Sequence, residues 1–324
     1  MTPACTMARL ATLAVLASAA TMATGAADLG DTTIDADTRI LVVSPHPDDE
    51  SLCCGGLIAT ARRAGARVSI VWITSGGGFR LDAMVVQKKA RPKHADMRAL
   101  ARRRIDEAQN AAAVLGVGAE GQYFLGYPDR GVLALLLDHY ESPYRSKYTG
   151  ASAVPWEVAV SPGSPYDGAS LERDFASIVE RVRPTLVLAP SPYDAHPDHR
   201  ASGILALRVL GTRGELDRVR FWIVHGGRGW PRPRALRPDL PQSPPPRGRS
   251  LPWETFAVDA AARESKRLAL REHETQLKVM GRKMMSYVRS TELYSPLPVA
   301  EADKRCIEAL PCAPEALPED EASL

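Results

Sequence analysis

Histidine and cysteine are scarce in this 324-residue chain, which contains seven histidines and five cysteines. No cysteines show the paired spacing of a zinc finger, so we do not expect a cysteine-based metal site. Neither sign of charge is in excess. The 41 basic and 38 acidic residues give a net charge of +3, and they are interspersed along the sequence. A protein with so small a net charge is not expected to attract nucleic acid or an anionic membrane.

The chain also lacks an apolar run suited to crossing a membrane. The run from Leu10 to Ala20 is too short and too rich in alanine for a stable span. Arg9 precedes it, small residues follow it, and residues 1–25 contain no acidic side chain. This order is typical of a secretory signal peptide, the alternative being an unstructured start. We therefore expect residues 1–27 to be a signal peptide and the protein to be secreted or periplasmic.

The cysteines fall into two pairs and one isolated residue. Cys5 would leave with the signal peptide. We expect Cys53 and Cys54 to pack as small buried apolar side chains. Cys306 and Cys312 are close enough in sequence to pair in an oxidising compartment.

Apolar runs alternate with helical segments along most of the chain. The pattern predicts strands over 39–44, 68–74, 122–126, 185–189 and 219–224, and helices over 52–64, 97–115, 171–183, 201–210 and 259–280. Strands that alternate with helices form right-handed βαβ units. The sequence therefore predicts an α/β fold with a doubly wound, Rossmann-like, mostly parallel sheet and helices on both faces.

The domain organisation follows from the segments that break this alternation. Residues 139–170 are rich in Tyr, Pro, Ser and Gly, and residues 226–252 are dense in Pro and Arg, so both are expected to be insertions. Residues 296–324 are rich in proline and acidic residues, which is typical of a disordered tail. We expect a single domain over residues 28–295.

Two short segments combine histidine with aspartate, Pro45–Glu50 (Pro-His-Pro-Asp-Asp-Glu) and His196–Arg200 (His-Pro-Asp-His-Arg). They hold three of the seven histidines, and each closely follows an apolar run that reads as a buried strand. Ligands bind beyond the carboxyl ends of the strands in doubly wound sheets. If both strands lie in one parallel sheet, the segments meet at one edge and can share a metal ion.

A catalytic zinc commonly takes three protein ligands and leaves one position for water. His46 and Asp49 can converge on one ion, and His199 is the natural third ligand. The remaining side chains, Asp48 and His196, then lie beside the metal without binding it.

Those unligated groups have the properties that hydrolysis requires. Asp48 can take the proton of the attacking water, and His196 can stabilise the oxyanion or protonate the leaving group. Asp198 can hydrogen-bond a histidine and fix its tautomer. The alternative is that these residues only cap helices and form turns, although such roles do not call for three histidines.

These motifs resemble the signature of the LmbE-like (PIG-L) family of zinc-dependent deacetylases, which act on N-acetylglucosamine-containing molecules or cleave related amides. Further segments that resemble the family are Arg104–Glu107 with the Ala-Ala-Ala-Val-Leu-Gly run that follows, Leu125–Asp129, and Lys266 with His273–Gln276. The resemblance covers roughly residues 38–290.

The resemblance implies zinc on His46, Asp49 and His199, with the roles given above for the other motif residues. It adds Arg104 and Asp129 as contacts to the sugar. The alternatives are that Arg104 pairs with Glu107 on its own helix and that Asp129 only shapes a turn. Some relatives carry a tyrosine just before the second motif, and whether Tyr193 takes that role is left open.

Three functional hypotheses follow. The first is a zinc-dependent amidohydrolase that removes the N-acetyl group from an N-acetylglucosamine-containing substrate, with Fe²⁺ or Co²⁺ as metals that suit the same ligands. The second keeps the site but acts on another N-acyl glycoside or a thiol-sugar conjugate. The third is a non-catalytic module that binds a sugar or a nucleotide. The expected partner is an N-acetyl amino sugar or glycoconjugate, and the oligomeric state is left open.

Three further features have weaker support. Gly76–Gly78 lacks the spacing of a dinucleotide-binding loop and is expected to let the backbone pass close to the site. His273 lies within a predicted helix, where packing or surface roles are commoner than catalysis. His225 follows a predicted strand and is a candidate for the rim of the cleft.

Overall fold

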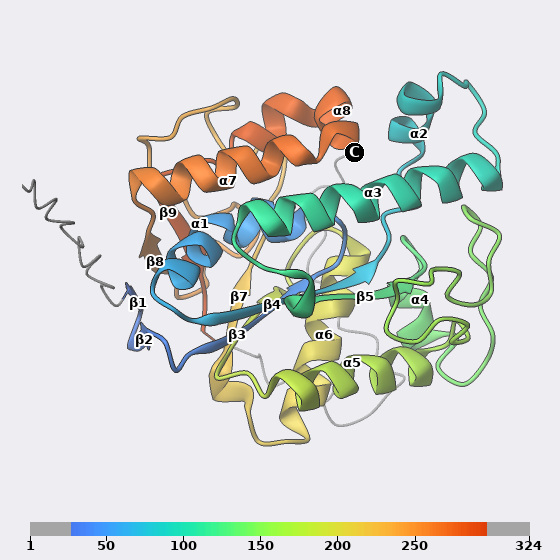
Figure 1. Ribbon diagram of the computed structural model, residues 1–324, viewed down its shortest axis with the longest axis horizontal. Coiled ribbons are helices and arrows are strands. Elements are labelled where there is room, and N and C mark those ends of the chain that lie inside the picture. The colour runs from blue at the N-terminus through green and yellow to red at the C-terminus, as the bar shows by residue number, and fades with distance from the viewer. Residues whose placement is uncertain (1–26, 297–324) are drawn as a thin grey trace, which may run out of the picture.

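The computed structural model describes residues 27–296, so the predicted signal peptide, Cys306, Cys312 and the tail lie outside the described part. A sheet of five parallel strands forms its centre, in the order β5-β4-β3-β6-β7 (Figure 1). The strands are β3 (Arg39–Ser44), β4 (Arg67–Thr74), β5 (Gln122–Tyr127), β6 (Leu186–Pro190) and β7 (Val219–Trp222). The predicted doubly wound α/β fold is confirmed.

Helices cover both faces of this sheet. In Figure 1, α1, α3, α7 and α8 lie on one side and α5 and α6 lie on the other. The helices are α1 (Asp49–Arg63), α2 (Arg80–Gln87), α3 (His94–Val114), α4 (Val132–Leu137), α5 (Gly168–Val182), α6 (Pro197–Gly211), α7 (Ala260–Glu272) and α8 (Glu274–Met285), with 3₁₀ turns at Ala119–Gly121 and Leu216–Arg218. None of the helices within residues 27–296 has the length and apolar character to cross a bilayer.

Burial explains why the central strands are continuous apolar runs. Ile40, Leu41, Val42 and Val43 of β3 are all fully buried, because helices cover the strand from above and below. Val42 pairs with Ile70 of β4 on one side and with Leu188 of β6 on the other. The first strand of the sheet therefore lies at its centre.

The order of the strands creates a crevice at the centre of the sheet. The chain adds β4 and β5 on one side of β3, and then returns to add β6 and β7 on the other side. Connections leave β3 and β6 in opposite directions, which opens a crevice at their carboxyl ends. The two histidine motifs follow these two adjacent strands, so the fold places them together.

Some predicted boundaries were wrong. The helix predicted over 259–280 is two helices, α7 and α8, because the backbone breaks at His273 (φ −78°, ψ 57°). Strand β7 ends at Trp222 instead of residue 224. The sequence did not predict α2, α4 or two small antiparallel ribbons, formed by β1 (Ala27–Leu29) with β2 (Thr32–Ile34) and by β8 (Glu254–Ala257) with β9 (Thr291–Tyr294).

The first predicted insertion is packed against the sheet. Residues 138–167 contain isolated bridges but no helix or strand, and α5 begins at Gly168. Val154 and Trp156 are buried in the main core, and the Tyr166 hydroxyl donates to the carbonyl of Gly126 at 3.1 Å. This segment therefore packs beside the carboxyl end of β5.

The adjacent cysteines of α1 differ from the expectation in their chemistry. Cys53 and Cys54 are both buried in the core, as predicted, but their Sγ atoms are joined in a disulfide. Their burial confirms the predicted packing, and the sequence did not predict the bond between them.

Candidate active site

The two motifs converge on one carboxylate oxygen at the carboxyl edge of the sheet. His46 Nδ1 and His199 Nε2 each lie 3.0 Å from Asp49 Oδ2. His46 lies in the turn after β3, Asp49 begins α1, and His199 lies in the first turn of α6. Asp49 and His199, which are 150 positions apart in sequence (199 − 49), thus meet, as the parallel sheet predicts.

The donor set fits a divalent metal ion. The side chains of His46, Asp49 and His199 are buried, and neither ring nitrogen of His199 forms an aligned hydrogen bond despite its close carboxylate neighbours. Ligands of a tetrahedral zinc, with bonds of about 2.0–2.1 Å, lie about 3.3 Å from one another. The donor atoms lie 3.0 Å apart, close to that spacing, and the contact between His199 and Asp49 is not an aligned hydrogen bond.

The charges around the site also favour a cation. Burial alone would lower the pKa of His199, but the carboxylates of Asp194 and Asp49 raise it to about 9. Burial would raise the pKa of Asp49, yet the adjacent His199 and His46 hold it well below its ordinary value. Carboxylates that stabilise a protonated imidazole equally attract a divalent metal ion, which replaces the proton.

Neighbouring side chains offer additional donor atoms. Within the described residues, three overlapping groups bring their donor atoms within 4.8 Å of one another. These groups are His46 with His196 and His199, Asp49 with His199 and His225, and His46 with Asp129 and Asp198. His225, which the sequence suggested only as a rim residue, thus lies beside Asp49 and His199.

Asp194 was not identified from the sequence, although it supports the second motif. Its Oδ2 lies 3.2 Å from His199 Nδ1 and accepts the backbone N–H groups of Val224 and His225 at 2.9 Å. Its Oδ1 accepts the N–H of His196 at 2.8 Å. Asp194 is fully buried and therefore joins the loop after β6 to the loop after β7. The available signal was an acidic residue two positions before a motif histidine.

Asp48 occupies a strained position next to the predicted ligands. Its φ of 137° is one that side chains other than glycine rarely adopt, and such strain often accompanies function. Its carboxylate lies 3.4 Å from Arg104 Nη2. The pKa of Asp48 is raised to about 7, chiefly by burial, which the Arg104 charge opposes and the Asp49 charge reinforces. A carboxylate with this pKa can accept a proton near neutral pH.

His196 is held as a neutral imidazole. Its Nδ1 accepts the backbone N–H of Asp198 at 3.2 Å, so the proton of the neutral ring lies on Nε2. Burial lowers the pKa of His196 to about 4, and the adjacent His46 and His199 lower it as well. The ring lies 4.7 Å from that of His46. His196 is thus prepared to donate a hydrogen bond from Nε2.

Arg104 points into the site and not along its own helix. Its Nη1 donates to the carbonyl of Gly76 at 2.9 Å and its Nη2 to the carbonyl of Pro47 at 2.8 Å. Glu107, the alternative partner, pairs with Arg103 instead. Gly76 has φ +66°, and a Cβ there would lie 2.4 Å from the guanidinium. The glycine loop therefore allows the close backbone approach that the sequence predicted.

Asp129 and Asp198 both contact the outer nitrogen of His46. His46 Nε2 lies 3.4 Å from Asp129 Oδ1 and 3.2 Å from Asp198 Oδ2. Asp129 also accepts the N–H of Gly78 at 2.7 Å, and Asp198 accepts the N–H of Arg130 at 2.6 Å. Asp198 therefore does hydrogen-bond a histidine, and Asp129 does more than shape a turn.

A buried ion pair lies behind the first motif. His273 Nε2 lies 3.0 Å from Glu50 Oε1, and Trp72 Nε1 donates to Glu50 Oε2 at 2.9 Å. Glu50 Oε2 also accepts the backbone N–H of Asp48 at 3.1 Å. His273, which the sequence placed within a helix, is therefore buried at a helix break and helps to fix the turn that carries Asp48.

Some of these side chains line a cavity of about 180 Å³, whereas the fully buried His199 does not. Its lining combines charged and polar groups with apolar side chains. The cavity is lined by His46, Asp48, Asp49, Leu52, Phe79, Arg104, Asp129, Arg130, His196, Val224, His225, Met280, Lys283, Met284 and Tyr287. Tyr193 is absent from this lining, and its carbonyl accepts a hydrogen bond from Arg247 Nε at 2.8 Å.

Comparison with known proteins identifies the family to which the chain belongs. The profile of the PIG-L family, described as GlcNAc-PI de-N-acetylase, matches residues 41–210. The chain is 31% identical over 185 residues to a 1D-myo-inositol 2-acetamido-2-deoxy-alpha-D-glucopyranoside deacetylase of Corynebacterium urealyticum, covering 56% of this chain and 50% of that protein. It is 25% identical over 191 residues to the diacetylchitobiose deacetylase of Thermococcus kodakarensis, covering 58% and 55%.

A solved structure shares the fold over most of the chain. The zinc-inhibited form of a teicoplanin deacetylase matches with a TM-score of 0.53 and 20% identity, covering 82% of this chain and 99% of that one. The two curated matches, in contrast, span only about half the length of those relatives.

Proposed function

Because the chain belongs to the PIG-L family, we propose that it is a zinc-dependent amidohydrolase that removes the N-acetyl group from an N-acetylglucosamine-containing substrate. The observation that carries the proposal is the convergence of His46 Nδ1 and His199 Nε2 on Asp49 Oδ2, at 3.0 Å each. The two relatives named above as deacetylases of acetamido sugars support the substrate class. They also argue against a non-catalytic binding module.

His46, Asp49 and His199 would hold the metal. When bound there, zinc supplies a Lewis acid for the amide carbonyl and lowers the pKa of a water ligand. The same imidazole and carboxylate donors suit Fe²⁺ or Co²⁺. Restoring chelator-treated protein with each metal in turn, and measuring acetate release, identifies the active ion.

The remaining groups move a proton and stabilise charge. Asp48, whose pKa is raised to about 7 chiefly by burial, takes a proton from the attacking water. His196 donates from Nε2 to the carbonyl oxygen as negative charge develops on it. The proton held by Asp48 then passes to the departing amine, which leaves acetate and a free amino sugar. Arg104 and Asp129 lie where they can orient the sugar.

The test combines metal content with acetate release on N-acetylglucosamine-containing substrates. Replacing Asp48→Asn removes the base, so we expect a loss of about 10²- to 10⁴-fold in kcat while the protein still binds stoichiometric zinc. Asp106→Asn, an exposed carboxylate on α3, is the matched control and should keep full activity. A zinc-loaded Asp48→Asn protein with the wild-type rate would refute the proposed base.

One observation favours the second hypothesis, an amidase with a different substrate. Leu52, Phe79, Met280 and Met284 give the lining of the cavity four large apolar side chains. They support an amidase that acts on another N-acyl glycoside or a thiol-sugar conjugate. Rates on substrates that differ only in acyl length separate the two candidates, because a longer acyl chain should be preferred only under the second.

We also propose that the protein is exported to the periplasm or the medium. The support is the basic, apolar and small order of the first 25 residues, which lie outside the described part of the chain. Cell fractionation with N-terminal sequencing tests this, and a cytoplasmic protein that retains Met1 contradicts it.

A further inference from the structure

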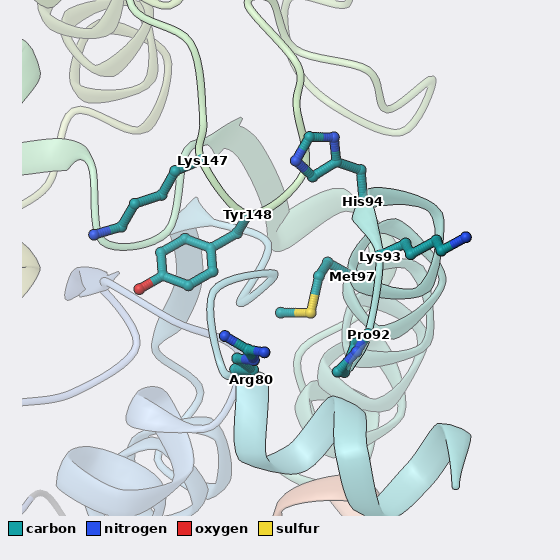
Figure 2. Close-up of a pocket in the computed structure, with 7 residues that line it drawn as sticks. All are labelled: Arg80, Pro92, Lys93, His94, Met97, Lys147 and Tyr148. Atoms are coloured by element: carbon teal, nitrogen blue, oxygen red, sulfur yellow. The ribbon is translucent and has the colours of Figure 1, made fainter. Parts of the chain in front are cut away.

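A second and larger cavity lies next to the site and is strongly cationic. It has a volume of about 670 Å³ and is lined by Arg80, Pro92, Lys93, His94, Met97, Lys147 and Tyr148. Figure 2 shows that Arg80 comes from the start of α2, Lys93 and His94 from the start of α3, and Lys147 and Tyr148 from a loop of the first insertion. Three segments distant in sequence therefore form this cavity.

The positive charge of this cavity has no internal counter-charge. Its lining contains no acidic residue, and Arg80, Lys93 and Lys147 form no ion pair with any residue between 27 and 296. The nearby Asp96 is paired with Lys89. Unpaired cations gathered in a hollow create a local positive potential that attracts anions, although the net charge of the whole chain is only +3.

The cationic cavity and the active-site cavity have lining residues that are adjacent in sequence. Phe79 lines the active-site cavity, whereas its neighbour Arg80 lines the cationic one. Just before them, Gly78 donates to Asp129, and a Cβ on Gly77 would lie 3.1 Å from Thr149 Cγ2, beside Tyr148. Consecutive Cα atoms are about 3.8 Å apart. Because the lining residues of the two cavities are neighbours, a substrate longer than one sugar could contact both cavities.

We propose that this cavity is a subsite for an anionic group, a carboxylate, phosphate or sulfate, carried by the substrate next to its N-acetyl sugar. The inference rests on the proposed function and narrows it to acidic glycoconjugates. Arg80 offers the planar fork that binds such groups through two hydrogen bonds. Lys147 supplies a second charge, with its Nζ 5.2 Å from the centre of the Tyr148 ring. That ring offers a flat apolar face for a sugar.

The small number of cations in the cavity favours a single anionic group over an extended anionic surface. In Figure 2, Arg80, Met97, Tyr148 and His94 surround the hollow, while the terminal amine of Lys93 is directed away from the others. Anionic membrane surfaces are typically bound by clusters of about four to eight lysines and arginines, whereas three line this cavity. The amine of Lys147 lies beyond the Tyr148 ring, near its hydroxyl, so Arg80 is the cation that borders the hollow in this view.

The experiment compares matched neutral and anionic substrates. Rates are measured on N-acetylglucosamine, its 1-phosphate and its 6-phosphate, and its 3-O-lactyl ether, because the position of the anionic group is not fixed. We expect at least one anionic substrate to have a kcat/KM about tenfold above that of N-acetylglucosamine, chiefly through KM. This advantage should shrink as salt is raised from 0.05 to about 0.5 M.

Charge-removing variants assign the effect to the cavity. Arg80→Gln and Lys147→Gln should each reduce the ratio of anionic to neutral kcat/KM, on the order of tenfold for a hydrogen-bonded charge. Lys147→Arg should keep the ratio. Arg213→Gln, which removes an exposed cation beyond the far end of α6, is the matched control and should leave it unchanged.

The outcomes separate this inference from the proposed function. If N-acetylglucosamine is hydrolysed but no anionic substrate is preferred, or the variants keep the preference, the subsite is wrong and the deacetylase stands. If no substrate is hydrolysed, calorimetric binding of the same sugars still decides: anionic sugars should bind more tightly than the neutral one, and Arg80→Gln should abolish the difference. Binding only to anionic lipid vesicles, without sugar preference, would overturn the proposal.

Discussion

Replacing Asp194→Asn tests how the second motif is held in place. Asp194 is fully buried and accepts three backbone N–H groups, at 2.8, 2.9 and 2.9 Å. Asparagine has nearly the same shape but only one oxygen. If that oxygen keeps the two bonds to Val224 and His225, the new NH₂ group faces the N–H of His196. One buried donor then has no acceptor, which costs about 1–3 kcal/mol.

The same substitution should also weaken metal binding. Asp194 Oδ2 lies 3.2 Å from His199 Nδ1 and fixes the ring whose other nitrogen faces Asp49. Losing a carboxylate partner of a ligand histidine typically costs 10- to 100-fold in metal affinity. We therefore expect Asp194→Asn to lower the free energy of unfolding by about 1–3 kcal/mol and to weaken zinc binding by one to two orders of magnitude.

Two measurements with a matched control separate these effects. Urea unfolding gives the stability, and competition with a chromophoric chelator gives the zinc affinity. Asp174→Asn is the control, because Asp174 is also buried but accepts hydroxyl donors from Tyr127 and Ser161 away from the motifs. It should leave zinc affinity unchanged. Wild-type zinc affinity in Asp194→Asn would refute the role assigned to the contact with His199.

Two further predictions concern residues next to Arg104. Burial raises the pKa of Asp82 from 3.8 to about 6, so its ionisation destabilises the fold above that pH. Asp82→Asn should stabilise the protein by at most about 3 kcal/mol at pH 8, and this gain should vanish near pH 4. Urea unfolding at both pH values measures the effect, and an equal gain at pH 4 and pH 8 would contradict the prediction. Gly76→Ala places a Cβ against the Arg104 guanidinium at a φ of +66°, so KM should rise severalfold while circular dichroism still reports a folded protein. An unchanged KM would mean that Arg104 does not orient substrate.

Local sequence patterns were sufficient for the architecture and for the meeting of the motifs. Continuous apolar runs such as Ile40–Val43 indicate strands covered on both faces, and alternation with helices leaves only parallel crossovers. Because parallel strands end at one edge, motifs that follow β3 and β6 must face the same crevice. His46, Asp49 and His199 could therefore be brought together before any coordinates were known.

The tertiary structure alone decided which other groups join them. Asp194, His225 and His273 act through partners on other elements, and no periodicity in the sequence records those contacts. The helix break at His273, between α7 and α8, lies where its side chain contacts Glu50 of α1. The cationic cavity likewise depends on three separate segments meeting. Local patterns set the backbone layers, whereas long-range packing sets the electrostatic environment, because charge and burial depend on distances in space and not along the chain.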